Sequence, residues 1–311
     1  MNIHVLVFAR PQKIGEVTRK NLDFMEKSAE ALGHTIEIIH DDECHMKFGS
    51  KPELFIKNHD IKKIKVLIVK ANPSGRNMAY RSAVIRQFEL LGILVINKEQ
   101  AVMKAKNKLR TLQVLTKKNV TVPKTYIVNH AQYIDDIIPD IGSFPVILKS
   151  VSGSHGQGVS IVESKRGLRS VIEMLNKNGE SEPIIIQKYI KESKGRDIRV
   201  FIVGGRIIGA MERIATRRGE FRSNFHLGGR VKIAEMSPEE KSEALAAAAA
   251  CGLDFAGVDV IRTNSGPQIL EVNSNPGLEG ITLATGRDIA GEIIKYAVEK
   301  TKKRRRKTKI L

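Results

Sequence analysis

The chain has 311 residues, of which 41% are hydrophobic and 28% are charged, and its formal net charge is +18. This length allows two or three domains with their own cores, and the apolar content indicates a globular protein. No apolar run is long enough to span a membrane, so no membrane contact is expected. The two cysteines, Cys44 and Cys251, lie far apart without metal-ligand spacing, which fits a reducing compartment and a cytoplasmic location.

The positive charge is concentrated at the C-terminus. Residues 300–311 carry eight basic side chains and no acid, so this tail is expected to be disordered. It could bind RNA or another polyanion without sequence preference, by releasing counterions, or it could simply keep the chain soluble. The remaining excess of ten positive charges still favours acidic substrates or partners.

The first third of the chain alternates strands and helices. Strands are expected over residues 2–9, 35–40, 65–70 and 93–96, with helices over 17–32 and 81–91. This alternation predicts a small parallel α/β sheet over residues 1–97. The first strand is not followed by the G-x-G-x-x-G fingerprint, so a dinucleotide site is not expected there.

A strongly basic helix is predicted over residues 99–119, and Pro123 blocks its continuation. Strands follow over 124–128 and 145–151. The second contains Lys149 among apolar neighbours, and a lysine in such a strand needs an anionic partner. The next segment, 151–160, has three glycines that could present backbone N–H groups to phosphate oxygens, although a flexible turn is the commoner meaning of such glycines.

The second half of the chain continues with a buried strand over 183–190 and a hairpin whose arms cover 200–203 and 206–212. The loop 221–229 contains an arginine and two hydrogen-bonding side chains, which could grip a phosphate or carboxylate or form a solvated turn. Ser237 and Glu240 form a capping box that begins an alanine-rich helix ending at Gly252. A last amphipathic helix is expected over 288–300.

The segment 257–277 consists of two β-branched runs around a polar turn, which predicts a hairpin. Asp259 lies six residues before Ser265 and Glu271 six after it, so a symmetric hairpin places the two carboxylates about 4.5–5.5 Å apart. Period-two alternation adds Asn273 to the same face. Two repelling carboxylates and an amide suit Mg²⁺, but a solvated face with ordinary acids is the open alternative.

Several short motifs occur in an order that resembles the ATP-grasp superfamily and, more closely, the RimK-type glutamate ligases. They are Arg86-Gln87-Phe88-Glu89, the Lys149 strand with its glycine-rich loop, Gln187-Lys188-Tyr189-Ile190, Asp197-Ile198-Arg199, Phe221-Arg222-Ser223-Asn224, Ala256-Gly257-Val258-Asp259 and Glu271-Val272-Asn273. The resemblance spans nearly the whole chain except the basic tail.

This resemblance implies an α/β and α+β fold in which two lobes clasp ATP. The expected parts are an N-terminal α/β domain over 1–97, a central lobe over 98–190, a C-terminal lobe with the metal site over 191–299, and the basic tail over 300–311. The implied chemistry is carboxylate–amine ligation that requires ATP and Mg²⁺ and proceeds through an acylphosphate. The favoured reaction adds L-glutamate to a protein or peptide C-terminus, such as that of a ribosomal protein, or to a cofactor carboxylate. A homo-oligomer is also implied.

The resemblance assigns roles to individual residues. Asp259, Glu271 and Asn273 would hold Mg²⁺ or Mn²⁺, with two ions in each active site. The phosphates would be neutralised by Lys108 and Lys149 and covered by the loop around Gly156 and Gly158. The backbone of Lys188 and Tyr189 would meet adenine, and Asp197 would hold the ribose. Arg222, Ser223 and Asn224 would face the phosphates, with Arg222 and Asn224 acting on the acylphosphate, and Arg199 and Arg213 are candidates to bind an acidic substrate.

Two other functions stay open. One is a related ligase with another amino acid or acceptor, such as a carrier protein in lysine biosynthesis. The other is a non-catalytic basic protein that binds RNA or the ribosome, for which the tail is the main argument. The non-catalytic function is disfavoured, because a binding module does not need two opposed carboxylates and an amide on one face.

Overall fold

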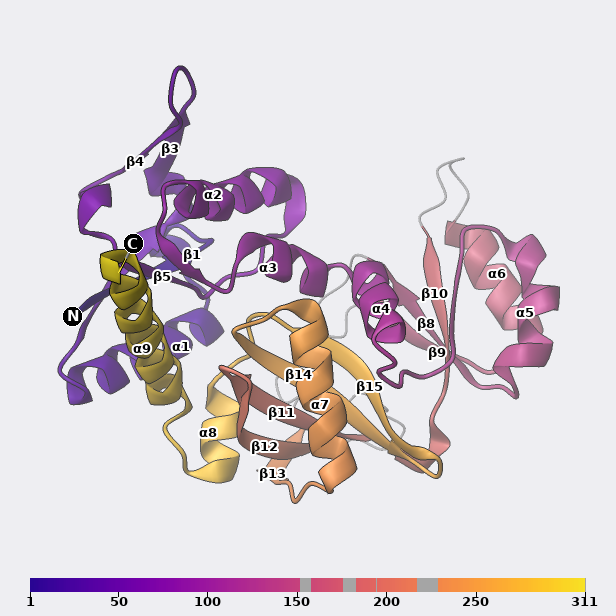
Figure 1. Cartoon of the computed structure of the whole chain (residues 1–311). Coiled ribbons are helices and arrows are strands. Elements are labelled where there is room, and N and C mark those ends of the chain that lie inside the picture. The colour runs from indigo at the N-terminus through magenta and orange to yellow at the C-terminus, as the bar shows by residue number, and fades with distance from the viewer. Residues whose placement is uncertain (152–157, 176–182, 194, 217–228, 311) are drawn as a thin grey trace.

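The computed structural model describes residues 1–151, 158–175, 183–193, 195–216 and 229–310, with no side chains placed for 307–310. The chain forms a parallel sheet, two antiparallel sheets and a small separate hairpin (Figure 1). The α/β and α+β class expected from the sequence is therefore confirmed. None of the helices in these described segments is long and apolar enough to cross a membrane.

The N-terminal sheet is parallel and has the order β2-β1-β5-β6. Its strands are β1 (Asn2–Val7), β2 (Thr35–His40), β5 (Val66–Val69) and β6 (Leu94–Ile96). Side chains alternate between its two faces: Ile3 and Val5 pack with α1 (Glu16–Ala31), whereas Leu6 packs with α2 (Met78–Leu90). This sheet confirms the predicted parallel α/β unit. The hairpin of β3 (Cys44–Lys47) and β4 (Glu53–Ile56) lies on the α2 side and was not anticipated from the sequence.

The central sheet is antiparallel, with the order β7-β10-β8-β9. Its strands are β7 (Thr125–Val128), β8 (Val146–Ser150), β9 (Val159–Val162) and β10 (Ile184–Lys188). Two helices, α5 (Ile134–Ile141) and α6 (Lys165–Leu175), bury their apolar faces against it. Short 3₁₀ helices elsewhere cover Pro11–Lys13, Asp41–Glu43, Ile61–Lys63, Gly75–Asn77, Ala131–Tyr133 and Lys191–Ser193.

The single basic helix predicted over residues 99–119 is wrong, because the structure contains two helices there. They are α3 (Glu99–Lys106) and α4 (Lys108–Lys117). Asn107 separates them with φ −96° and ψ 107°, and its side chain accepts a hydrogen bond from the backbone N–H of Arg110. Asparagine caps a helix N-terminus better than it continues one, so the break places Lys108 at the first position of a new helix.

The C-terminal sheet is antiparallel, with the order β13-β12-β11-β14-β15. Its strands are β11 (Arg196–Val203), β12 (Arg206–Ile214), β13 (Arg230–Ile233), β14 (Phe255–Thr263) and β15 (Gly266–Asn273). The alanine-rich helix α7 (Pro238–Cys251) covers one face, with the predicted capping box and a left-handed Gly252 at its end. On the other face lies α8 (Glu279–Thr285), which packs against β12 and the N-terminal domain.

The predicted disorder of residues 300–311 is also wrong up to residue 310, since helix α9 covers Ile289–Ile310. Its first half is anchored by Ile289, Ile293 and Ile294, which are buried against α1 and the N-terminal sheet (Figure 1). Lysine and arginine are good helix formers, and extending an existing helix costs far less than starting one. The basic segment therefore prolongs a docked helix.

Asn97 joins the N-terminal domain to the C-terminal sheet. It follows β6, is fully buried, and donates from Nδ2 to the backbone carbonyls of Phe255 (2.8 Å) and Ser274 (3.0 Å). Its Oδ1 accepts from the backbone N–H groups of Asp254 (2.6 Å) and Phe255 (3.0 Å). All four hydrogen bonds tie the end of β6 to the start of β14 and the end of β15.

We expect Asn97→Ala to lower the free energy of unfolding by several kcal/mol, because each buried group left unpaired costs about 1–3 kcal/mol. Asn97→Asp keeps the acceptor but places a buried carboxylate oxygen against the carbonyls of Phe255 and Ser274, so it should be at least as destabilising as Asn97→Ala. Denaturant unfolding measures both variants, with Gln100→Ala, on the exposed surface of α3, as the control. Equal stability of Asn97→Ala and the control would contradict this role.

Candidate active site

One face of the C-terminal sheet carries a row of charged side chains. Residues such as Ile198, Val258 and Val272 pack toward α7 on the opposite face. Because strand residues alternate between faces, the charged residues next to them point away from α7. They are Asp197 and Arg199 on β11, Arg213 on β12, Asp259 on β14 and Glu271 on β15.

The strand register places Asp259 directly opposite Glu271, as predicted. The reason differs from the symmetric hairpin assumed from the sequence, because the turn joins Thr263 to Gly266 and is centred between Asn264 and Ser265. A regular hairpin around that turn would put Leu270 opposite Asp259. A register shift between Asp259 and Val260 inserts one extra residue in β15, and this bulge turns Glu271 onto the charged face.

Asp259 is buried and paired with two arginines. Arg199 donates to both of its carboxylate oxygens, at 2.7 Å from Nε and 2.6 Å from a terminal nitrogen. Arg213 donates to Asp259 Oδ2 at 2.8 Å. Burial alone would raise the pKa of Asp259, but the two guanidinium groups outweigh it and the pKa is lowered. Asp259 is therefore ionised although its side chain is buried.

Arg213 is shared between two carboxylates. It also makes a bidentate pair with Asp197, at 2.6 and 2.7 Å, and its side chain is only 8% exposed. Burial disfavours its charge, yet the two neighbouring acids raise its pKa above the ordinary arginine value. Asp197 and Arg199 thus sit next to each other around the same buried charge network, and their predicted roles toward ribose and an acidic substrate stay predictions.

Two lysines from the central part of the chain approach Glu271. Lys149 lies on β8, donates to Gln187 Oε1 at 2.7 Å, and interacts electrostatically with Glu271, Lys108 and Asp259. Burial lowers its pKa to about 8, with Lys108 contributing and the acids opposing. Burial also lowers the pKa of Lys108, while Glu271 opposes the shift. The structure therefore brings together both predicted phosphate-binding lysines and both predicted metal-binding acids.

Asn273 closes this cluster at the end of β15. Its position in the register opposite Gly257 places it on the same face as Glu271, two residues along. Its Nδ2 atom is buried and has no hydrogen-bond partner among the described residues. The two ends of an asparagine amide are assigned by their hydrogen bonds, so a flip would turn the oxygen toward the same space.

The segment after Asn273 is held by the N-terminal domain. Lys70, at the end of β5, is buried and donates from Nζ to the carbonyl of Pro276 at 2.6 Å. Burial lowers the pKa of Lys70 to about 7. The Asn21 side chain accepts from the backbone N–H of Leu278 at 2.8 Å. These contacts fix the backbone that immediately follows the third predicted metal ligand.

The remaining predicted nucleotide contacts lie at the edge of the described structure. Gly158 has φ +71°, and a Cβ added there would come within 2.7 Å of the Ser150 hydroxyl, so this position requires glycine. Lys188 ends β10 with an exposed side chain, while its backbone N–H donates to the Lys124 carbonyl at 2.9 Å. Tyr189 is half-buried. Gly156, Arg222, Ser223 and Asn224 lie outside the described residues.

The donor set fits a hard divalent cation bound with a triphosphate. A carboxylate offers about four lone-pair sites, and Asp259 uses three of them for its arginine hydrogen bonds. Glu271 and the buried amide edge of Asn273 add oxygen donors of the kind that Mg²⁺ binds in combination with phosphate oxygens and water. The two lysines supply the positive charge that phosphates need.

Some residues that shape the site were missed at the level of sequence. Gln187 was noted only as part of a motif, although it orients Lys149 and in turn donates to the Thr125 hydroxyl at 2.8 Å. Lys70 carries the same signal that singled out Lys149, a lysine at the end of an apolar strand. Its partner is a backbone carbonyl far along the chain, which no local pattern specifies.

Comparison with known proteins agrees with this geometry. Residues 105–297 match the model of the RimK-like ATP-grasp domain, and residues 4–102 match that of the RimK PreATP-grasp domain. The chain is 37% identical over 306 residues to "Probable alpha-L-glutamate ligase 2" of Pseudoalteromonas atlantica, covering 98% of each chain. It is 41% identical over 276 residues to "Probable alpha-L-glutamate ligase" of a Marinomonas species, covering 88% of this chain and 90% of the relative.

A solved structure shows the same fold. The ATP-grasp ligase PsnB, determined with a minimal precursor, Mg and ADP, superposes with a TM-score of 0.73 at 20% identity. The match covers 96% of this chain and 97% of PsnB.

The lowered pKa of Lys149 predicts a pH dependence for triphosphate binding. Part of the amine is neutral in the free protein at a pH near its lowered pKa. A bound phosphate would raise that pKa again, so ATP binding should take up protons around pH 8. ATP affinity should fall as the pH rises above 8. Calorimetry in buffers of different ionisation enthalpy measures the uptake. In Lys149→Arg, whose side chain stays charged, the uptake from this position disappears; equal uptake in both proteins would contradict the assignment.

Proposed function

The chain belongs to the RimK-like ATP-grasp family and is a ligase that forms carbon–nitrogen bonds, and on this basis we propose that it joins L-glutamate, through its amine, to a terminal carboxylate. In this reaction the γ-phosphoryl group of ATP passes to a carboxylate oxygen and ADP leaves. The amine then attacks the acyl carbon, phosphate leaves with the oxygen, and the amine loses a proton as the amide forms. No side-chain nucleophile is required.

The observation that carries this proposal is the pairing of Asp259 with Glu271 across β14 and β15, beside Lys149 of the central sheet and Lys108 of α4. A protein that binds only nucleic acid would gain nothing from buried carboxylates next to its cationic groups. Opposite charges on facing elements suit a ligand that is itself a cation bound to a polyanion. That ligand is Mg²⁺ with ATP, the pair that the family implies.

We assign the ligands of the site accordingly. Asp259, Glu271 and Asn273 hold Mg²⁺, or Mn²⁺ in its place, with two ions per site. When bound, the metal neutralises phosphate oxygens as charge builds on the transferring group. Lys108 and Lys149 neutralise the phosphates from the other side.

The roles of the other residues follow from the same proposal. The loop of Gly156 and Gly158 covers the phosphates, the backbone of Lys188 and Tyr189 meets adenine, and Asp197 holds ribose. Arg222, Ser223 and Asn224 face the reacting phosphoryl group, with Arg222 and Asn224 acting on the acylphosphate.

The two arginines predicted to bind an acidic substrate differ in their surroundings. Among the described residues, the Arg199 side chain is 17% exposed and pairs with Asp259 alone, whereas Arg213 is 8% exposed and spans two acids. We assign Arg199 as the contact to the substrate carboxylate and Arg213 as the residue that positions Asp197 and Asp259.

The acceptor carboxylate is proposed to be a peptide or protein C-terminus. PsnB, which shares the fold, was solved with a precursor, and the relatives carry the name glutamate ligase. A ribosomal protein as acceptor, a carrier protein in lysine biosynthesis as the alternative, and a homo-oligomeric assembly remain predictions of the resemblance. Supplying ATP, Mg²⁺ and single amino acids with candidate peptides, while following phosphate release and product mass, separates them.

We expect Glu271→Gln to reduce turnover by more than about 100-fold, because even the outer partners of metal ligands contribute 10–100-fold. The folded state should keep its stability, since the variant removes a charge from among partly buried side chains without changing their volume. Turnover and ADP binding are measured across a Mg²⁺ titration, with Glu173→Gln on the exposed face of α6 as the matched control. If Glu271→Gln has the same turnover and the same Mg²⁺ requirement as the wild type, the metal site is refuted.

The basic end of α9 is proposed to bind polyanions such as RNA. A chain ending at Lys303 loses the five basic side chains of residues 304–311 but keeps the Lys300–Asp254 ion pair and the buried Thr301. Its affinity for a single-stranded RNA homopolymer should be weaker and less salt-dependent than that of the full chain, because fewer counterions are released. Fluorescence anisotropy at several salt concentrations measures this. Turnover on a free peptide should be unchanged, and an unaltered salt dependence would contradict the proposal.

A further inference from the structure

Two histidines and a glutamate meet on the N-terminal sheet, away from the nucleotide-binding face. His4 lies on β1 and Glu37 lies opposite it on β2. His59 comes from the turn after β4. One ligand atom from each of the three side chains lies within 4.8 Å of the other two.

The local backbone explains how His59 reaches this position. The backbone N–H of His59 donates to the Ile56 carbonyl at 3.2 Å, which closes a tight turn directly after β4. Asn58 adopts φ +61° within this turn, a conformation that asparagine tolerates better than most residues. The side chain of His59 is 14% exposed, so it lies between the sheet and solvent.

The three side chains converge on one oxygen atom. Glu37 Oε2 is 3.1 Å from His4 Nε2 and 3.2 Å from His59 Nδ1. Asn2 Nδ2 donates to the other carboxylate oxygen and fixes its orientation. His4 is 2% exposed, and its second ring nitrogen is buried without a hydrogen-bond partner among the described residues. An imidazole in this setting has only one polar partner to satisfy it.

These separations match the edges of a small coordination polyhedron. With metal–nitrogen and metal–oxygen bonds of about 2.0–2.2 Å, tetrahedral ligand atoms lie roughly 3.3 Å apart. Two of the three edges already have this length. The third edge, between the two imidazole nitrogens, is at most 4.8 Å, and a rotation of His59 on its surface turn can shorten it.

We propose that His4, Glu37 and His59 bind a divalent transition-metal ion of the zinc class. Two imidazoles and one carboxylate form the mixed nitrogen and oxygen donor set of such ions, with a fourth position open. The active site offers only oxygen donors from Asp259, Glu271 and Asn273, which suits Mg²⁺. The two sites therefore differ in the metal they select, and this proposal does not depend on the ligase reaction.

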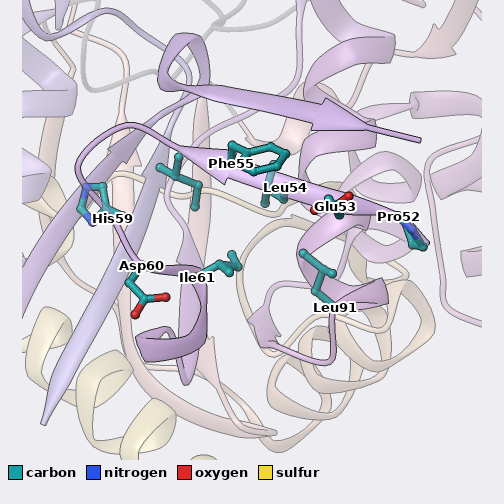
Figure 2. A pocket seen from close by; sticks show the side chains of 9 residues that line it. Pro52, Glu53, Leu54, Phe55, His59, Asp60, Ile61 and Leu91 are labelled. Atoms are coloured by element: carbon teal, nitrogen blue, oxygen red, sulfur yellow. The ribbon is translucent and has the colours of Figure 1, made fainter. Parts of the chain in front are cut away.

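The surroundings leave room for the fourth ligand. His59 also lines one end of an open groove of about 350 Å³ between the β3–β4 hairpin and Leu91 (Figure 2). The Glu37 side chain is 46% exposed, so solvent reaches the outer side of the cluster. Burial lowers the pKa of His4, which favours the neutral imidazole that metals bind.

Such an ion would join three separate segments, β1, β2 and the turn after β4. Since these segments are close only in the folded chain, binding would stabilise the N-terminal domain in proportion to the free metal concentration. A site of this kind is a structural clamp at the edge of the sheet, where β2 has only one neighbouring strand.

The test uses the full-length, untagged chain and ZnCl₂ in excess Mg²⁺. Calorimetry gives the number of zinc ions bound, and the visible absorption of Co²⁺ reports a low-coordinate nitrogen-containing site. His59→Gln should lose one zinc ion, the Co²⁺ band and the zinc-dependent rise in Tm. Glu37→Gln is the second variant, and His45→Gln, an exposed histidine on β3, is the matched control that should retain all three.

Glu271→Gln separates the two sites, because it should lose Mg²⁺-dependent turnover and keep the zinc ion. If His59→Gln and Glu37→Gln bind as much zinc as the wild type and the same Co²⁺ band appears in all of them, the proposal is overturned. The three side chains would then form only a hydrogen-bonded network in which Glu37 accepts from both histidines.

Discussion

The buried charge of Asp259 is the constraint on which the arrangement of the C-terminal lobe depends. An ionised carboxylate in a site of low exposure is costly unless it is paired and hydrogen-bonded. Here β11 supplies Arg199, and β12 supplies Arg213, which is itself balanced by Asp197. Three neighbouring strands must therefore keep their register for one carboxylate to stay charged. The separate pairing of β14 with β15 brings Glu271 opposite Asp259, so the ion-pair network and the candidate metal site meet at Asp259.

The position of the site relative to the rest of the molecule depends on the N-terminal domain. Asn97 binds the backbone at the start of β14 and the end of β15, and Lys70 binds the carbonyl of Pro276 just beyond Asn273. Both residues come from the carboxyl ends of parallel strands, where side chains converge at one edge of a sheet. The pre-ATP-grasp unit thus acts as a support for the hairpin that carries the proposed metal ligands.

The sequence located the strands and facing residues of the candidate site, but not the turn and the bulge that align them. Alternation and motif order located β14 and β15 and paired Asp259 with Glu271 correctly, but only because a bulge after Ile269 compensates for a misplaced turn. Such a bulge depends on packing of Ile269 and Val272 against α7, which a single-strand pattern does not contain. Lys149 was recognisable as a lysine in an apolar strand. Lys70 had the same pattern, yet its partner lies more than 200 residues away and only the folded chain identifies it.

The wrong predictions have a common physical origin. The basic tail was expected to be disordered because of its charge, but α9 is nucleated by isoleucines buried on a distant domain and then continues through residues that favour helices. The predicted single helix over 99–119 failed at Asn107, where a side-chain cap competes with helix continuation. A tertiary contact determined the structure of the tail, and one local hydrogen bond determined where the helix breaks. The average composition of each segment predicted neither.

In the proposed ligand complex, the acids and the lysines of the candidate active site would exchange partners without leaving a charge unpaired. Before a ligand binds, the electrostatic neighbours of Lys149 are Glu271 and Asp259, and Glu271 also opposes the lowered pKa of Lys108. A metal ion bound to a triphosphate offers each side a stronger partner, since the acids can turn to the cation and the lysines to the phosphates. Because Asp259 already has two arginines, its share of this exchange would be small. Glu271 has no arginine partner among the described residues, so its contacts would change the most. A metal ion with triphosphate would therefore enter a site whose charges are already compensated. Its binding would rearrange existing electrostatic contacts and would not bury new isolated charges.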